Sequence, residues 1–255
     1  MYKQPDSPQP IGGVLDNGFS LYRHSLKGTF LFAFVGSLLS APVGRVAPTP
    51  GAPADFGLIA TLLTLSLVTF VLSLVIWGAI IARIHAVQHG ESLTAREAVA
   101  VGLRRFPVML GVVLLAMLML GVGFLLLVIP GIYLLVRILF APFAAITESK
   151  GVTESIRYSF ELTRGRWWRT FLLVTIVSIV VSVLYAIVIV VVGAFGGAEL
   201  DELERLPWQF DFVVMPLLGG LLAPLSYALI MAIYADYKLR SEGADIAERI
   251  AAAEA

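Results

Sequence analysis

Arg137 is the residue whose position most needs a chemical explanation. It interrupts an uncharged stretch that begins at Phe106 and continues, beyond the arginine, to Thr147. A guanidinium there costs at least about 2.5 to 3.5 kcal/mol, so a compensating partner is expected. The structural interpretation is a carbonyl clamp or a buried pair, with Glu199 and Asp211 as the acids within reach of the side chain. The alternative is a cavity in which Arg137 contacts a ligand or a lipid headgroup.

Glu148 and two histidines are the other groups whose types suggest chemistry. Glu148 stands alone at the end of the same stretch, where it is expected to cap a helix or to pair with Arg157. His85 and His89 are four residues apart and share one helical face. A metal site needs further ligands, and the sequence fixes none beside the histidines, so no metal site is predicted.

Trp167 and Trp168 lie between Arg166 and Arg169, an arrangement typical of the aromatic belt at a membrane boundary. Two apolar stretches also carry hydroxyl side chains at helical spacing, at Ser66, Thr69 and Ser73 and at Thr175, Ser178 and Ser182. Such stripes bond between packed helices or line a thin polar path. Helix packing is the favoured interpretation.

Signatures of enzymes are missing from the sequence. It has no glycine-rich phosphate loop, no nucleophile elbow and no paired carboxylates within its apolar stretches. The absence of cysteine excludes disulfides and thiolate metal sites, and the zero formal charge gives no indication of a nucleic-acid partner. We therefore predict a protein that is not an enzyme, with no catalytic, cofactor-binding or metal-ligating residues and no cofactor.

The elements that must position these residues are membrane-spanning helices. The chain is 58% hydrophobic and 14% charged, with a mean hydropathy of +0.90, values that water-soluble domains of this size rarely approach. About 20 apolar residues of helix cross a bilayer. The predicted spans are residues 28–44, 57–82, 106–128, 132–147, 170–195 and 212–236.

The third and fourth spans come from one nearly apolar segment. As a single helix its roughly 42 residues would be about 63 Å long, twice the thickness of a bilayer. Pro130 and Gly131 lie inside the segment, where proline cannot donate a backbone hydrogen bond and glycine lets the chain reverse. A tight hairpin is predicted at these two residues.

The distribution of basic residues predicts the orientation. With both termini inside, all but a few of the Lys and Arg residues fall on the cytoplasmic side, whereas Arg45 and Arg205 fall outside. The N-terminus lacks the pattern of a cleaved signal peptide. We predict a multi-pass protein of the bacterial inner membrane with both termini and a tail, residues 238–255, in the cytoplasm.

Three basic amphipathic segments precede spans, at residues 13–27, 94–105 and 153–166. Each is too short and too charged to cross a membrane, so an interfacial helix with basic groups toward lipid phosphates is predicted. Thr94 and Glu97 have the spacing of a capping box that begins the second. The fold class predicted is an all-α integral membrane protein: one polytopic domain, residues 1–255, built as a pseudo-threefold repeat of interfacial helix and helical hairpin.

One segment resembles a known family. It contains Pro130, Gly131, Tyr133, Arg137, Phe140, Pro142 and Glu148, followed by Ser159, Leu162, Thr163, Gly165 and Trp167. The segment resembles the YciC-type bacterial inner-membrane proteins and the related membrane domain of some glycerophosphodiester phosphodiesterases. The resemblance implies a membrane-embedded domain without an established catalytic role. It implies no hydrolase activity.

The function predicted is that of a non-enzymatic accessory or organising protein of the membrane that contacts lipids. The alternative is a small transporter, channel or lipid-moving protein in which Arg137 faces a cavity. Membrane lipids are the predicted partners. The sequence leaves a membrane protein partner or a homo-oligomer open.

Overall fold

The computed structural model describes residues 2–46, 55–196 and 210–253, and every regular element within these ranges is helical. The elements are α1 (Ile11–Val46), α2 (Phe56–Gln88), α3 (Ala95–Leu126), α4 (Val128–Ile138), α5 (Ala141–Thr147), α6 (Val152–Thr163), α7 (Trp167–Gly196), the short π-helix η2 (Phe210–Val214) and α8 (Met215–Ala253). In the described ranges six segments are long and apolar enough to cross a membrane, and each overlaps one of the six predicted spans, although the first and third begin well before the predicted residues. The predicted class, an all-α membrane protein, is confirmed.

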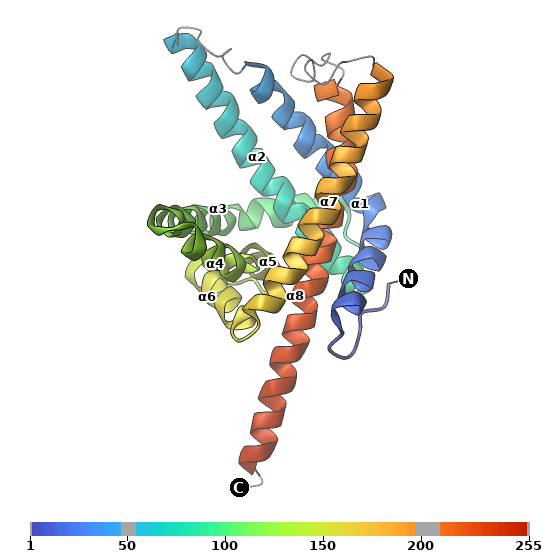
Figure 1. Ribbon diagram of the computed structural model, residues 1–255, viewed down its shortest axis with the longest axis vertical. Coiled ribbons are helices and arrows are strands. Elements are labelled where there is room, and N and C mark those ends of the chain that lie inside the picture. Colours follow the sequence, from blue (N-terminus) through green and yellow to red (C-terminus); the bar gives the residue numbers. More distant parts are fainter. Residues whose placement is uncertain (1, 47–54, 197–209, 254–255) are drawn as a thin grey trace.

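The helices form two groups that run in different directions. In Figure 1, α1, α2, α7 and α8 extend along the length of the molecule, whereas α3 runs across α2 and heads a lateral layer completed by α4, α5 and α6. The crossing depends on two glycines. A Cβ atom on Gly78 of α2 would lie 3.2 Å from the Cα of Gly102 of α3, and one on Gly102 would collide with the carbonyl of Val75. Larger residues there would force α2 and α3 apart.

Helices α1 and α8 pack along much of their lengths through small residues. A Cβ atom on Gly220 would lie 2.8 Å from the Phe30 ring. Next to it, Gly219 faces Ser37, whose hydroxyl donates to the carbonyl of Met215 at 3.3 Å. The two glycines therefore let α1 and α8 approach closely.

The predicted hairpin is present, but its turn lies earlier than the sequence indicated. Leu127 alone separates α3 from α4, with extended backbone angles. Pro130 is the third residue of α4, where a missing N–H costs nothing because the first turn of a helix has no partner for it. Gly131 instead allows close packing, since a Cβ atom there would collide with the ring of Phe124 in α3.

The fourth span is two helices, not the single helix predicted over residues 132–147. Helix α4 ends at Ile138 and α5 begins at Ala141, because Pro142 in the first turn of α5 cannot donate back to α4. The Ser159 hydroxyl of α6 satisfies the freed groups: it accepts from the amide of Phe140 at 3.1 Å and donates to the carbonyl of Arg137 at 2.6 Å. A polar side chain from outside the span thus stabilises its break.

Two of the three predicted interfacial helices are not separate elements. Residues 13–27 belong to α1, and residues 94–105 are the N-cap and first turns of α3, which continues through Pro107 into its apolar part. The capping box of Thr94 and Glu97 is confirmed. The third, α6, is separate, but its apolar face is covered by protein: Ile156, Ser159 and Leu162 are buried. This face is therefore not free to lie in lipid.

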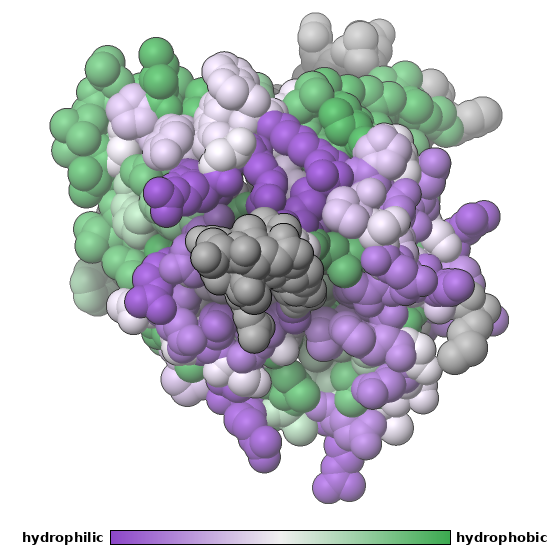
Figure 2. All heavy atoms as spheres, turned by 90° about the horizontal axis from the view of Figure 1, so that it is seen from below, coloured by the Kyte–Doolittle hydropathy of each residue, from purple (hydrophilic) through white to green (hydrophobic). Residues whose placement is uncertain are grey.

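One end of the molecule is polar. The predicted tail, residues 238–255, is helical as far as Ala253 and continues α8 to the C-terminus, at the bottom of Figure 1. Seen from below, hydrophilic residues cover much of the view, and apolar surface lies mainly along its upper and left edges (Figure 2). We call the end of the molecule that carries the C-terminal part of α8 the polar end. It carries exposed charged pairs such as Arg157 and Glu161 of α6, 3.4 Å apart.

Candidate functional site

Arg137 caps the end of α6. Its Nη1 atom donates to the carbonyl of Phe160 at 2.8 Å and to the Thr163 hydroxyl at 3.1 Å. The guanidinium carbon also lies 4.8 Å from the centre of the Phe160 ring. Carbonyls in the last turn of a helix lack intrahelical partners and carry partial negative charge, so a cation there is favourable. The geometry is the carbonyl clamp of the structural interpretation.

The hydrogen bonds described for the Arg137 side chain go to α6. Glu199 and the side chain of Asp211 are outside the described residues, and the donors that can be followed from Arg137 point to α6. The fourth span was predicted as one straight helix over residues 132–147. Because the span is broken and α6 packs back against it, the contact of Arg137 with α6 did not follow from that helix.

Tyr133, Trp167 and Trp168 gather beside Arg137. The indole N–H of Trp167 donates to the carbonyl of Tyr133 at 3.2 Å, and the two rings stack with centres 5.9 Å apart. Trp168 meets Trp167 edge to face, at 4.7 Å, and is 76% exposed. The structure therefore brings together four of the residues singled out in the sequence, at the place where α4 meets the start of α7.

Glu148 pairs with α8 and not with Arg157. Its Oε1 atom lies 2.8 Å from Lys238 Nζ and accepts a hydrogen bond from the Tyr234 hydroxyl at 3.2 Å. Arg157 pairs with Glu161 instead. Lys238 could not be identified as the partner of Glu148 from the sequence, because residue 238 was predicted to begin a cytoplasmic tail.

A polar cavity of about 220 Å³ adjoins the Glu148 pair. Gln88, which is buried, contributes an Oε1 atom without a hydrogen-bond partner, and the His85 and His89 rings lie 4.3 Å apart. Burial alone would raise the pKa of Glu148. The hydrogen bond and positive charge of Lys238, together with smaller contributions from Tyr234 and His85, outweigh burial, so the pKa of Glu148 is lowered. Within the described part of the chain no three histidine or acidic side chains are grouped to hold a metal ion.

Asp236 is the centre of a network that the sequence analysis missed. Its side chain is only 4% exposed, and its Oδ2 atom lies 3.1 Å from Arg169 Nη2 and 2.8 Å from Arg240 Nε. Its Oδ1 atom accepts from the amide of Gln9 at 2.7 Å. Both arginines also donate to the Gln9 carbonyl, at 2.8 and 2.6 Å. One buried carboxylate thus joins α7, α8 and the N-terminal segment.

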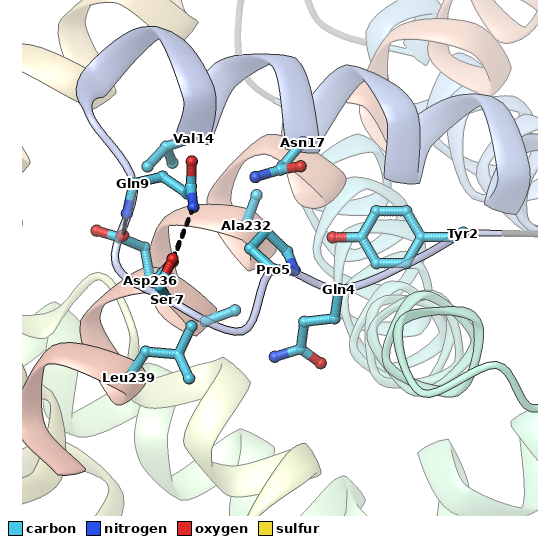
Figure 3. Close-up of a pocket in the computed structure, with 11 residues that line it drawn as sticks. Tyr2, Gln4, Pro5, Ser7, Gln9, Val14, Asn17, Ala232, Asp236 and Leu239 are labelled. Atoms are coloured by element: carbon cyan, nitrogen blue, oxygen red, sulfur yellow. Dashed lines mark hydrogen bonds between the residues drawn. The ribbon is translucent and has the colours of Figure 1, made fainter. Parts of the chain in front are cut away.

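The N-terminal segment, residues 2–10, fills a groove between α1 and α8. Figure 3 shows it lying over Ala232, Asp236 and Leu239, and the space left there is only about 10 Å³. Tyr2 is 8% exposed, and burial raises the pKa of its hydroxyl. From the sequence, the only prediction for this segment was that it is not a cleaved signal peptide. Only the partner surface on α8 explains why it is ordered.

An open hollow of about 550 Å³ lies on the other side of this network. Its lining residues are Gly165, Arg166, Trp167, Trp168, Arg169 and Arg240. Arg166 makes one long hydrogen bond, 3.5 Å, to the carbonyl of Arg240, and its guanidinium carbon lies 6.0 Å from the centre of the Tyr237 ring. Among the described residues Arg166 forms no ion pair. We call this hollow the arginine pocket.

A second, largely apolar groove of about 460 Å³ lies between α4 and α7. Its lining includes the predicted hydroxyl stripe of α7, namely Thr175, Ser178 and Ser182. In the α2 stripe, Thr69 has the packing role that was favoured, because its hydroxyl donates to the carbonyl of Leu39 in α1 at 3.2 Å. The two stripes therefore have different environments: Thr69 of α2 contacts α1, whereas the α7 hydroxyls line an open groove.

Comparison with known proteins gives a family without a described activity. The model of an uncharacterised protein family, UPF0259, matches residues 56–196, from the start of α2 to the end of α7. No curated protein and no solved structure gives a significant match. The matched range contains Arg137, Glu148 and both tryptophans of the arginine pocket, whereas Asp236 lies beyond it. Kinship with membrane domains of phosphodiesterases stays a prediction. Because the match covers more than half of the chain, the protein belongs to the uncharacterised family UPF0259.

Proposed function

We propose that the protein is a non-enzymatic accessory or organising component of the bacterial inner membrane, and that it contacts anionic lipids at its polar end. The observation that carries the proposal is the arginine pocket. Three arginines line it, two of which pair with the buried carboxylate of Asp236, and two tryptophans line it at the start of the apolar helix α7. Basic groups and tryptophans at such a boundary are typical of contact with lipid headgroups.

The orientation proposed puts the polar end in the cytoplasm. Retention of Lys and Arg on the cytoplasmic side supports this, because the basic residues at this end, including Arg157, Arg166 and Lys238, would otherwise have to be translocated. The cytoplasmic leaflet of bacterial membranes is also where anionic headgroups would meet them. Each basic side chain close to an anionic surface contributes on the order of 1 kcal/mol.

The charged groups within the bundle support a structural use more than transport or catalysis. Arg137 is engaged with α6, and Asp236 with two arginines. A transporter in which Arg137 faces a cavity would need that side chain free to meet a substrate. The contacts of Arg137 therefore favour the accessory function.

The lipids that remain bound after extraction test the proposal. The full-length protein is purified in a mild detergent, and its lipids are compared with those of the membrane it came from. We expect phosphatidylglycerol and cardiolipin to be enriched over phosphatidylethanolamine, and the enrichment to fall as salt in the wash screens the charges. Bound lipids of the same composition as the bulk membrane, at every salt concentration, would contradict the proposal.

A further inference from the structure

We infer that the arginine pocket binds the phosphate group of a single anionic phospholipid. This inference rests on the proposed function and makes it specific, because it assigns the lipid contact to one site and one chemical group. The pocket is lined by Arg166, Arg169 and Arg240, which come from the turn before α7, from α7 itself and from α8. Guanidinium groups bind phosphate oxygens through paired, charge-assisted hydrogen bonds.

The charge balance of the pocket favours an anion. Asp236 is the carboxylate paired with the arginines, and it offsets one of the three positive charges. Its Oδ2 atom is shared between Arg169 and Arg240, so Arg166 is left with one long hydrogen bond to a carbonyl. In addition, the Nε atom of Arg169 is buried without a hydrogen-bond partner. An anion entering the hollow would neutralise the excess charge.

The start of α7 adds to the attraction. The helix begins at Trp167, and its first backbone hydrogen bond runs from the amide of Thr170 to the carbonyl of Arg166, at 2.9 Å. The amides before Thr170 therefore have no intrahelical partner, and the helix dipole favours negative charge at this end. The arginines and the dipole act on the same space because Trp167, Trp168 and Arg169 all line the pocket.

The surroundings indicate a lipid more than a soluble anion. Trp168, the second residue of the apolar 30-residue helix α7, lines the pocket and is 76% exposed, as expected for a side chain at headgroup depth. Trp167, which lines the pocket, stacks on Phe171 with ring centres 5.2 Å apart, and Phe171 lines the groove between α4 and α7. An acyl chain can follow that groove while the phosphate stays among the arginines.

Arg166 is the residue that separates lipid binding from internal structure. Arg169 and Arg240 hold Asp236 and Gln9, so their removal would also disturb the fold. Within the part of the chain that the structure describes, Arg166 has no ion pair of this kind. Arg164, two residues earlier, is exposed, carries the same charge and does not line the pocket, and so provides a matched control.

The experiment compares lipid binding by the parent, Arg166→Gln, Arg166→Lys and Arg164→Gln. Native mass spectrometry of the full-length protein in detergent measures the retention of added phosphatidylglycerol, phosphatidylcholine and inorganic phosphate. We expect preferential binding of phosphatidylglycerol, weakened about tenfold by Arg166→Gln, as for the loss of a charge-assisted hydrogen bond. Arg166→Lys should give an intermediate loss, because it keeps the charge without the fork. Arg164→Gln should bind as the parent does.

The outcomes distinguish the pocket from the wider function. Equal binding of both lipids by the parent would overturn the proposed function and the pocket together. A clear preference that Arg166→Gln and Arg164→Gln reduce equally would overturn the pocket alone. Binding of inorganic phosphate as tight as that of phosphatidylglycerol would replace the lipid with a soluble anion. Melting temperatures of all variants are measured alongside, and if Arg166→Gln is unstable, Arg166→Lys against Arg164→Lys decides.

Discussion

Asp236 and Glu148 are two carboxylates at the polar end, and they are held in different ways. Asp236 is 4% exposed and is shared by two arginines and the amide of Gln9. Glu148 is 23% exposed and pairs with Lys238, whose own side chain is 39% exposed. A buried charge that loses its partners costs much more than a partly solvated one. The comparison therefore predicts that Asp236 stabilises the fold, whereas Glu148 contributes little.

The two carboxylates also connect different parts of the chain. Asp236 joins α7 and α8 to the N-terminal segment, which fills the groove shown in Figure 3. Glu148 joins the end of α5 to α8 and borders a polar cavity. The Asp236 network leaves almost no space between the N-terminal segment and α8, whereas the cavity beside Glu148 has room for water.

Asp236→Asn should produce the largest loss of stability. The substitution keeps the size of the side chain but leaves Arg169 and Arg240 without a carboxylate, at a cost of about 3 to 5 kcal/mol. The measurement is the melting temperature in detergent. Glu161→Gln is the control, because it removes a carboxylate from an exposed pair and should change little. Equal effects of the two substitutions would show that the Asp236 network does not hold the fold together.

Arg137→Ala should have the next largest effect. It removes the cap on α6, and hydrogen bonds from a charged donor contribute about 1.5 to 3 kcal/mol. Thr163→Val removes a second acceptor of the same guanidinium, so the two losses should not be additive when combined. Melting temperatures of the single and double variants measure this coupling. Additive losses, or an Arg137→Ala protein as stable as its parent, would reject the cap and favour a cavity role for Arg137.

Glu148→Gln should have the smallest effect, about 1 kcal/mol or less, and the effect should depend on pH. The pKa of Glu148 is lowered in the folded protein below its ordinary value of 4.5, so folding favours the ionised form. The contribution is therefore fully present above about pH 4.5 and is lost as the pH falls through the lower folded pKa. Melting curves of parent and variant should converge at acidic pH. A difference that grows on acidification would reverse this assignment.

The helices were largely predictable from sequence, but their interruptions were not. Long uncharged stretches indicate spans because few other structures tolerate them. The break before Pro142 depends on Ser159, a residue from a helix that follows the span. The turn at Leu127 came earlier than Pro130 because proline is accepted in the first turn of a helix. Neither position can be recognised without knowing what packs against it.

The candidate site was only partly predictable for the same reason. Trp167 and Trp168 were recognised because their position between basic residues follows a known membrane pattern. Asp236, Arg240 and Gln9 were missed because they are distant in sequence and meet only when α8 continues past its apolar part. Arg137 was recognised as needing a partner, but the partner is a helix end, which composition does not reveal.

The orientation of the polar end is the claim on which the account depends most, and thiol labelling tests it directly. The chain has no cysteine, so single cysteines can be placed by Ser92→Cys and Lys150→Cys at the polar end and by Ala52→Cys and Glu202→Cys in the two loops predicted to lie outside. A membrane-impermeant thiol reagent is applied to intact spheroplasts, with lysed spheroplasts as the control for reactivity. We expect Ala52→Cys and Glu202→Cys to be labelled in intact spheroplasts, and the other two only after lysis. Labelling of Lys150→Cys from outside would contradict the cytoplasmic polar end and the lipid contacts assigned to it.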